Sequence, residues 1–294
     1  MPLTKHNNSF EADKPQNTLK FDLTHYSIFL IPIMMKTILD KIAENKRQEI
    51  AVLKSKYKLS DFESMLFFHQ ETRSLSNAIQ QQEFGIIAEF KRKSPSAGDI
   101  RMAADPLDVV ANYQKAGAAA ISCLTDTAYF GGSMRDLEII REFTKLPVLR
   151  KDFIIDEIQL FEAKAHGADA VLLISELLDP EHAKQLTIIA QSLGMEVLME
   201  AHDRAHLEKI NDLVDVIGIN NRDLHAQKTD IETSIQLFDY LPKDRLCISE
   251  SGVKAAADLE RLQATGYHGA LVGESLLKTD NPASLISKTP VPCS

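Results

Sequence analysis

Glutamate, lysine and asparagine residues follow several short apolar runs of this sequence, at positions where acid–base chemistry could take place. Glu89 and Lys91 stand two residues apart, so an extended strand points both to the same side. Lys151, Glu200 and Asn220 follow three further runs. Lysines and carboxylates that share a partly buried site shift each other's pKa values, as proton transfer requires. The sequence therefore predicts a site that works with lysine and carboxylate groups.

The histidines and cysteines of the sequence do not show the spacing of a known metal site. No histidine falls at the ends of these runs, and the three cysteines form no CxxC pair. We therefore expect no metal in the site. Cys123 and Cys247 lie inside apolar runs, which predicts buried and unreactive thiols, whereas Cys293 lies outside such a run.

Two turns of small residues predict a phosphate site. Ser251-Gly252 and Gly273-Glu274 each follow an apolar run and precede a helical segment. Exposed backbone N–H groups at such turns bind phosphate. We expect the carboxylate of Glu274 to point away from the anion while its N–H contributes.

The elements that must position these residues are short apolar runs, which alternate with helix-sized intervals from about residue 85 onward. Eight runs are predicted as strands: 86–90, 120–124, 147–150, 170–174, 196–200, 216–220, 246–249 and 269–272. Short strands that are apolar throughout are typical of parallel sheets buried on both faces. Eight strand–helix units in succession predict a single α/β domain, a closed (β/α)8 or TIM barrel. Its active site is expected at the carboxyl ends of the strands.

Three glycines are expected to shape this barrel rather than to bind a ligand. Gly117, Gly167 and Gly266 each come just before a predicted strand. A glycine there can end the preceding helix in the left-handed conformation and turn the chain back.

Two helices are predicted before the first strand. Apolar residues at helical spacing predict one over residues 36–57. A second is expected from Asp61 to about Thr72, with Ser60 as its N-cap and Glu63 at the capping-box position.

The domain boundary is predicted near Met35. We assign residues 1–34 to an irregular or disordered extension, because they are polar and then unusually apolar. Residues 35–294 are assigned to the barrel domain, with N-terminal helices within 36–82.

The charge balance argues against a nucleic-acid partner. The formal net charge is −9, whereas binding to a phosphate backbone needs clustered Lys and Arg. The apolar stretch 26–35 is too short for a membrane helix and is broken by Pro32. We expect a cytoplasmic protein, because an odd number of cysteines without a secretion signal fits a reducing compartment. The sequence does not indicate an oligomeric partner.

Several segments together resemble the motifs of the indole-3-glycerol-phosphate synthase family. The matching segments, in family order, are 87–96 with Gly98, 129–133, 149–153, 198–201, 217–224, 249–253 and 271–276. The resemblance runs from about Met35 to Leu277. It implies ring closure of 1-(2-carboxyphenylamino)-1-deoxyribulose 5-phosphate to indole-3-glycerol phosphate, with loss of carbon dioxide and water, without a cofactor, in tryptophan biosynthesis.

The same resemblance implies roles for the charged residues. Lys151 would be the general acid that protonates the substrate ketone during ring closure, and Glu200 the acid–base partner in loss of the hydroxyl. Lys91 would contact the substrate carboxylate or phosphate and donate a proton during dehydration. Glu89 would orient Lys151, and Asn220 would bind a hydroxyl.

The remaining predicted contacts are with the ring and the phosphate of the substrate. The residues are Ser94, Phe130, Phe153, Arg222, Ser251, Gly252, Gly273 and Glu274. The two phenylalanines would line the anthranilate ring, and the last four residues would hold the phosphate through main-chain N–H groups. The loop 92–102 is a candidate lid.

Two alternatives stay open at this point. One is a related barrel such as phosphoribosylanthranilate isomerase, whose chemistry usually relies on Cys and Asp at strand ends. The other is a barrel without catalytic activity that binds a sugar phosphate as a regulator. It would need the phosphate site but not both Lys91 and Lys151.

Overall fold

The computed structural model describes Pro2 and residues 37–222, 228–279 and 281–287. Contacts divide the chain into Met1–Met35 and Lys36–Ser294, and the description below concerns the second unit. The predictions for residues 1–34 and for Cys293 lie outside the described residues.

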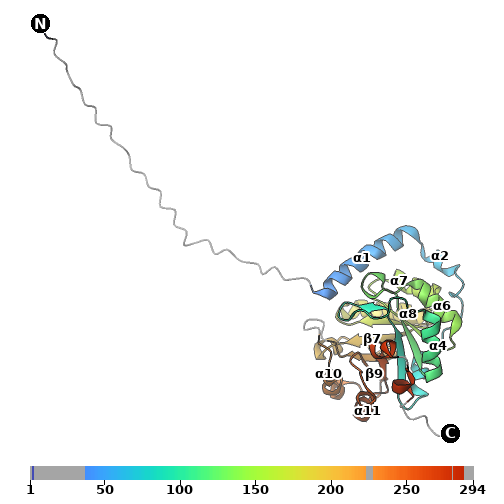
Figure 1. The fold of residues 1–294 in the computed structure, drawn as a ribbon. Coiled ribbons are helices and arrows are strands. Elements are labelled where there is room, and N and C mark those ends of the chain that lie inside the picture. The colour runs from blue at the N-terminus through green and yellow to red at the C-terminus, as the bar shows by residue number, and fades with distance from the viewer. Residues whose placement is uncertain (1, 3–36, 223–227, 280, 288–294) are drawn as a thin grey trace. The chain divides into compact units, whose positions relative to one another are not determined.

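The predicted apolar runs form eight parallel strands that close into a barrel, because β1 pairs with both β4 and β10 (Figure 1). The strands, in the order in which they pair around the barrel, are β1 (Gly85–Phe90), β4 (Ala120–Leu124), β5 (Val148–Lys151), β6 (Ala170–Ile174), β7 (Glu196–Ala201), β8 (Val216–Asn220), β9 (Cys247–Glu250) and β10 (Gly269–Val272). The predicted TIM barrel is therefore confirmed.

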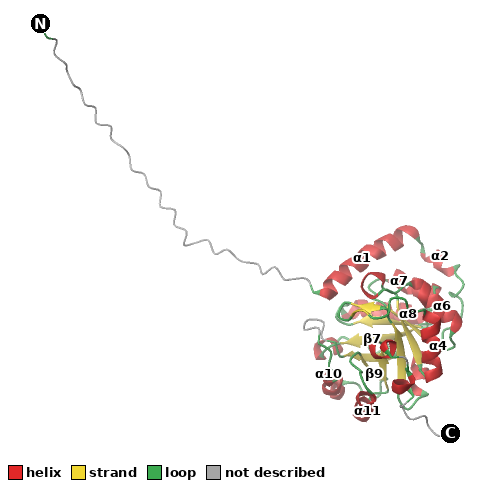
Figure 2. Ribbon diagram, in the orientation of Figure 1, coloured by secondary structure: helices red, strands yellow, loops and turns green. Residues whose placement is uncertain are grey.

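Helices follow the strands and cover the outside of the barrel (Figure 2). They are α4 (Pro106–Ala116), α5 (Thr127–Phe130), α6 (Met134–Phe143), α7 (Glu157–Ala165), α8 (Pro180–Ser192), α9 (Arg204–Leu207), α10 (Glu232–Leu237), η2 (Phe238–Tyr240), α11 (Ala256–Thr265), α12 (Glu274–Lys278) and α13 (Ala283–Ile286). Gly117 and Gly266 end α4 and α11 with left-handed φ values of 92° and 116°, and Gly167 after α7 has a φ of 89°. The predicted structural role of these glycines is confirmed.

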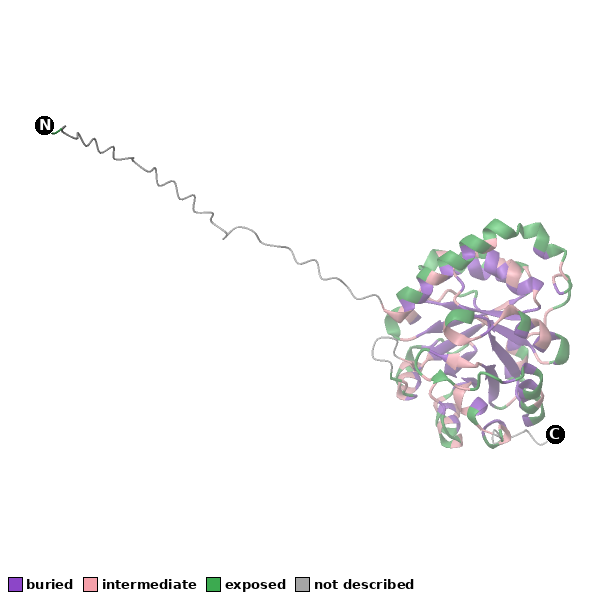
Figure 3. Cartoon of the chain, turned by 45° about the horizontal axis from the view of Figure 1, so that its top comes forward, coloured by how far each residue is buried: buried purple, intermediate pink, exposed green. Residues whose placement is uncertain are grey.

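Two apolar layers result from the alternation of side chains along the strands. Ile87, Leu149 and Leu198 point into the barrel and pack in one buried cluster. Ile86 and Phe90 point outward and pack in a second cluster against the helices. Figure 3 shows the strands buried and the outer helix surfaces exposed. Since Ile87 points inward, Glu89 and Lys91 lie on the same inner face of β1, as predicted.

The segment before β1 contains α1 (Ile38–Lys56), α2 (Leu59–Glu63) and α3 (Leu75–Gln80). The first predicted helix is confirmed, with Thr37 as its N-cap. The second is wrong, because α2 ends at Glu63 and begins after Lys58. Ser60 therefore lies inside the helix rather than at its N-cap.

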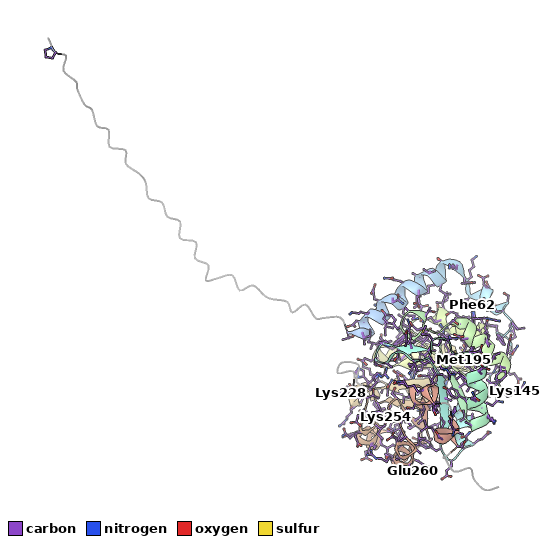
Figure 4. The ribbon with its side chains drawn as sticks, in the orientation of Figure 1. Phe62, Lys145, Met195, Lys228, Lys254 and Glu260 are labelled. Atoms are coloured by element: carbon purple, nitrogen blue, oxygen red, sulfur yellow. The ribbon has the colours of Figure 1, made fainter. Side chains whose placement is uncertain are left out.

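The reason for the early end of α2 is packing. The carboxylate of Asp61 accepts a hydrogen bond from the Lys58 N–H, which fixes the start of the helix three residues earlier. Phe62, labelled in Figure 4, is buried against α1 and α7 with Ile50 and Ile158. The chain then turns and buries Phe67, which a continued helix would not allow.

The amino-terminal end of the barrel is closed by α3 and a buried ion network. Leu75 and Ile79 from α3 are fully buried in the inner cluster. Asp169, also fully buried, accepts hydrogen bonds from the N–H groups of Arg73 and Val148 at 2.7 and 2.8 Å. Arg141 donates to both oxygens of Asp169 at 2.8 Å. This network joins the N-terminal segment to β5 and α6.

Candidate active site

Two adjoining cavities lie at the carboxyl ends of the strands. The smaller, of about 90 Å³, is lined by Leu39, Glu89, Lys91, Leu124, Phe130, Lys151, Asp152, Phe153, Leu172, Ile174, Glu200, Asn220, Arg222 and Ser251. The larger, of about 330 Å³, is lined by Glu89, Lys91, Ser96, Ala97, Arg222, Thr229, Ser251, Gly252, Val253, Lys254, Leu271, Val272, Gly273, Glu274 and Ser275. Because Glu89, Lys91, Arg222 and Ser251 line both, the cavities form one continuous site.

Glu89 connects the two lysines of the site. Its Oε1 lies 2.5 Å from Lys91 Nζ, and its Oε2 lies 3.3 Å from Lys151 Nζ. Burial alone would raise the pKa of Glu89, but the two ammonium groups lower it to about 2. Glu89 therefore stays charged at neutral pH and orients both lysines.

Lys151 has a second carboxylate partner that the sequence interpretation missed. Its Nζ donates to Oε2 of Glu250 at 2.9 Å. Burial alone would lower the pKa of Lys151, but Glu250, Glu89 and Glu200 raise it well above its ordinary value. Lys151 is thus a charged ammonium group at the inner wall of the smaller cavity.

Glu250 itself is fully buried, and among the described residues its Oε1 has no hydrogen-bond partner. Burial raises the pKa of Glu250 to about 7, although Lys151 opposes this shift. Gly218 on β8 makes room for this carboxylate, because a Cβ there would overlap Oε1 of Glu250. The available signal was the position of Glu250 at the end of an apolar run, directly before the Ser251-Gly252 turn.

Glu200 and Asn220 come from the neighbouring strands β7 and β8. The side-chain amide of Asn220 donates to the two oxygens of Glu200 at 3.4 and 3.3 Å. Burial raises the pKa of Glu200, while Lys151 and Asn220 oppose the shift. A buried carboxyl with a raised pKa is suited to exchange protons near neutral pH.

Aromatic side chains line one side of the smaller cavity. The ring centroids of Phe130 and Phe153 lie 5.9 Å apart, with a tilt of 38° between their planes. Leu39 from α1 lines the same cavity. The smaller cavity therefore has an aromatic wall on which a planar ring could pack, and Lys151 lines the same cavity.

The turn after β9 has the backbone geometry of an anion site. Ser251 and Gly252 both have left-handed conformations, with φ values of 67° and 84°, and Ser251 is the one non-glycine residue with positive φ in the described chain. Successive N–H groups in such turns form a concave nest for anions. Asn221 donates to the Ser251 carbonyl oxygen at 2.9 Å and so holds the turn.

The second half of the predicted phosphate site follows β10. Gly273 lines the larger cavity, and a Cβ there would overlap Oε1 of Glu89. The missing side chain of Gly273 therefore leaves room for the Glu89 carboxylate as well as for a phosphate in the cavity. Glu274 accepts a hydrogen bond from Lys278 Nζ at 2.6 Å, so its carboxylate is engaged by a cation of its own helix.

The chain is similar in sequence to proteins of one family. Residues 39–288 match the family model described as indole-3-glycerol phosphate synthase. A protein of that name from Bacteroides thetaiotaomicron is 43% identical over 252 residues, which cover 86% of this chain and 97% of the relative. Another from Hyphomonas neptunium is 43% identical over 249 residues, covering 83% and 94%.

The chain belongs to the indole-3-glycerol phosphate synthase family. Solved structures with low identity share its fold. The 3-hexulose-6-phosphate synthase of Salmonella typhimurium has a TM-score of 0.57 at 14% identity, covering 70% of this chain and 96% of that one. A mutant tryptophan synthase alpha-subunit from Pyrococcus furiosus has a TM-score of 0.51 at 17% identity, covering 69% and 93%.

Ser94 lies next to this synthase-family site but lines neither cavity. It is buried, and its hydroxyl accepts a hydrogen bond from the Ala97 N–H at 3.1 Å. The structure thus places Ser94 in the hairpin of β2 (Lys93–Ser94) and β3 (Gly98–Asp99), within the predicted lid 92–102. Ser96 and Ala97 at the tip of this hairpin line the larger cavity instead.

The N-terminal helix of the synthase fold is fixed to the site through Lys46, which the sequence interpretation also missed. This side chain is buried, and its Nζ lies 2.8 Å from Asp152 and 3.2 Å from Asp126. Burial alone would lower the pKa of Lys46, but these carboxylates raise it well above its ordinary value. The available signal was a lysine midway between Ile42 and Ile50, on the apolar face of α1.

The two cysteines inside strands are buried free thiols, as predicted. Burial raises the pKa of Cys247 to about 11 and that of Cys123 still further above its ordinary value. Neither lines a cavity of this synthase-family site. In the described part of the chain, no helix is long and apolar enough to cross a membrane. No group of three or more His, Cys, Asp or Glu residues could hold a metal ion there.

Proposed function

We propose that this protein acts as an indole-3-glycerol phosphate synthase in which Lys151 is the general acid of ring closure. The family, shown by the comparisons, catalyses a decarboxylating ring closure in tryptophan biosynthesis. The substrate class is a sugar phosphate that carries a carboxyphenylamino group. The observation that carries the assignment of Lys151 is its position between Glu89 and Glu250, beside the aromatic wall.

Ring closure needs a proton donor at the substrate ketone. The ring carbon that bears the carboxylate attacks the ketone carbon, so the ketone oxygen gains an electron pair. Lys151 is held protonated by its carboxylate neighbours and can deliver a proton to this oxygen, since an alkoxide is a stronger base than an amine. Loss of carbon dioxide then returns the electron pair to the aromatic ring.

Dehydration needs both an acid and a base. Lys91 is placed on the other side of Glu89 and would protonate the departing hydroxyl, which leaves as water. Glu200, with its raised pKa, would take the proton that the ring loses. Asn220, which contacts Glu200, would bind a substrate hydroxyl.

The two cavities match the two ends of this substrate. The anthranilate ring would lie against Phe130 and Phe153, and the phosphate would lie in the larger cavity against Ser251, Gly252, Gly273 and Glu274. Arg222 lines both cavities and would contact the substrate between its ring and its phosphate. We also propose a cytoplasmic location, supported by the free thiols of Cys123 and Cys247.

The proposal is tested by indole fluorescence during turnover of the carboxyphenylamino sugar phosphate. Lys151→Met should keep the fold and lower kcat by about a thousandfold or more, because no other group donates to the ketone oxygen. Lys91→Met should retain ring closure and accumulate an intermediate that has not lost water.

Lys145→Met is the matched control, because Lys145 is exposed on the outside of the barrel (Figure 4). Near-normal turnover by Lys151→Met would overturn its role. A parental protein that makes no indole product but isomerises phosphoribosylanthranilate would overturn the function itself.

A further inference from the structure

A buried histidine, His202, lies between a catalytic carboxylate and a carboxylate nearer to solvent. It follows β7 directly, so the expectation that no histidine lies at a strand end is wrong at this position. Its Nε2 lies 3.6 Å from Oε1 of Glu200, and its Nδ1 lies 3.5 Å from Oε2 of Glu176, which follows β6. The exposed fraction of the side chains rises along this row, from 5% for Glu200 to 8% for His202 and 17% for Glu176. The three groups thus lead from the buried site toward the surface.

The imidazole is not fixed by other side chains. Within the described residues neither ring nitrogen makes a hydrogen bond of normal length. Both contacts are slightly longer than a hydrogen bond, as is common in free enzymes whose catalytic contacts shorten when substrate binds. His202 can therefore engage the two carboxylates without breaking another interaction.

The charged groups around His202 come from several elements. Glu176 and Glu250 favour its protonated form, as does Asp203 in its own loop, whereas His206 opposes it. Burial is the largest influence and lowers the pKa of His202 below its ordinary value. The imidazole is therefore neutral at neutral pH, with one nitrogen that can accept a proton and one that can donate.

The reaction requires such a route because it consumes a proton. The substrate enters as a carboxylate, and the products are a neutral indole, carbon dioxide and water. Two protons are needed, one for the ketone oxygen and one for the departing hydroxyl. The ring returns only one. Each turnover must therefore take one proton from solvent into a site whose glutamates are buried and whose lysine side chains are only 11% and 13% exposed.

We propose that Glu176 and His202 form the path by which this proton enters. Glu176 receives a proton from solvent and passes it to Nδ1 of His202, while the proton on Nε2 passes to Glu200. Glu200 thus handles two protons per turnover, one lost by the ring and one delivered through His202, and these return Lys151 and Lys91 to their protonated forms. A ring tautomerisation or flip restores His202. No bond other than those to hydrogen changes, and no oxidant or reductant is needed. This inference rests on the proposed function.

The test follows indole fluorescence and proton uptake together in a single turnover, with a pH indicator in weakly buffered solution. In the parental enzyme both signals should rise together, with one proton taken up per indole formed. The glutamine in His202→Gln can bridge the two carboxylates but cannot relay a proton. In this variant proton uptake should lag behind indole formation, and reprotonation of the lysines should slow by roughly tenfold or more. His202→Phe and Glu176→Gln should show the same lag.

His206→Gln is the matched control, because His206 lies in α9, which follows His202, and pairs with Asp203 rather than with Glu200. Small buffer acids such as imidazole should partly restore the rate of His202→Phe, which a purely structural defect would not allow. Uptake that keeps pace with indole formation in both His202 variants would overturn the relay. A parental enzyme that forms no indole would instead overturn the proposed function, so the two failures are distinguishable.

Discussion

Buried ion networks occupy both ends of the same barrel strands, and they are built differently. At the amino-terminal end, Asp169 is saturated by two backbone N–H groups and the guanidinium of Arg141. At the carboxyl end, Glu250 contacts Lys151 through one oxygen, and its other oxygen has no hydrogen-bond partner among the described residues. We call these the closed and the open network.

The difference separates stability from chemistry. Burial raises the pKa of both Asp169 and Glu250, and that of Glu250 reaches about 7. The closed network links three segments and lines neither cavity of the candidate site, so its pairing contributes to folding. In the open network Lys151 lines the smaller cavity, whereas Glu250 lines neither cavity and contacts the site through Lys151. Three further predictions test this division, in order of decreasing effect.

Asp169→Asn should lower the free energy of unfolding by about 3–5 kcal/mol, because Arg141 then stays buried without a counter-charge. The kcat and KM of the folded enzyme should stay within about twofold, since general acid–base groups are untouched. Urea unfolding and steady-state kinetics measure the two effects. Asp215→Asn is the control, because Asp215 accepts from the Val197 N–H at the same end of the barrel and its side-chain partner is the neutral amide of Gln191. A large loss of kcat with unchanged stability would break the comparison.

Gly252→Val should raise KM by roughly 10- to 100-fold, about 1.4–2.7 kcal/mol of binding, with a smaller change in kcat. The φ of 84° is strained for valine, and a Cβ would lie 3.0 Å from Thr229 Cγ2, so the anion turn must shift. Steady-state kinetics give the result. Gly117→Ala has a comparable φ of 92° in open space far from the cavities, and should lower stability while leaving KM unchanged. An unchanged KM in Gly252→Val would contradict a phosphate site at this turn.

Glu250→Gln should change the pH dependence of stability. The folded pKa of about 7 lies above the ordinary value of 4.5, so between these values the folded protein binds more protons than the unfolded chain. The contribution of Glu250 is therefore full below about pH 4.5 and is lost as the pH rises to about 7. The parental protein should lose on the order of 1–3 kcal/mol relative to Glu250→Gln between pH 5 and pH 8. Urea midpoints at each pH measure this difference, and parallel curves for the two proteins would refute it.

The sequence predicts the barrel and most of the open network because both depend on local patterns. Alternation along β1 places Glu89 and Lys91 on one face, and apolar runs mark each strand to within about a residue at either end. Contacts between side chains on different strands do not depend on local patterns. The contact between Lys151 and Glu250 depends on two strands that lie opposite each other in the closed barrel, and on the space that Gly218 leaves. Neither follows from spacing in the chain.

The N-terminal segment shows the same limit. Helical periodicity predicts α1 and places Lys46 on its apolar face. It does not predict the ion pairs of Lys46, because Asp126 and Asp152 are distant in the sequence. The length of α2 depends on where Phe67 must be buried, which is a tertiary requirement. Ser94 was expected in the site because its segment resembles the family, and the structure places it in the hairpin that supports Ser96 and Ala97.

The pairing of β1 with β10 has a consequence for how the protein is made. A ribosome releases Glu89, Lys151 and Glu200 well before it releases β10 and the glycine that makes room for Glu89. Until β10 arrives, the edge of β1 is open and the second half of the phosphate turn does not exist. A chain cut short before β10 would therefore carry the proposed acid and base groups without the second half of the proposed phosphate site.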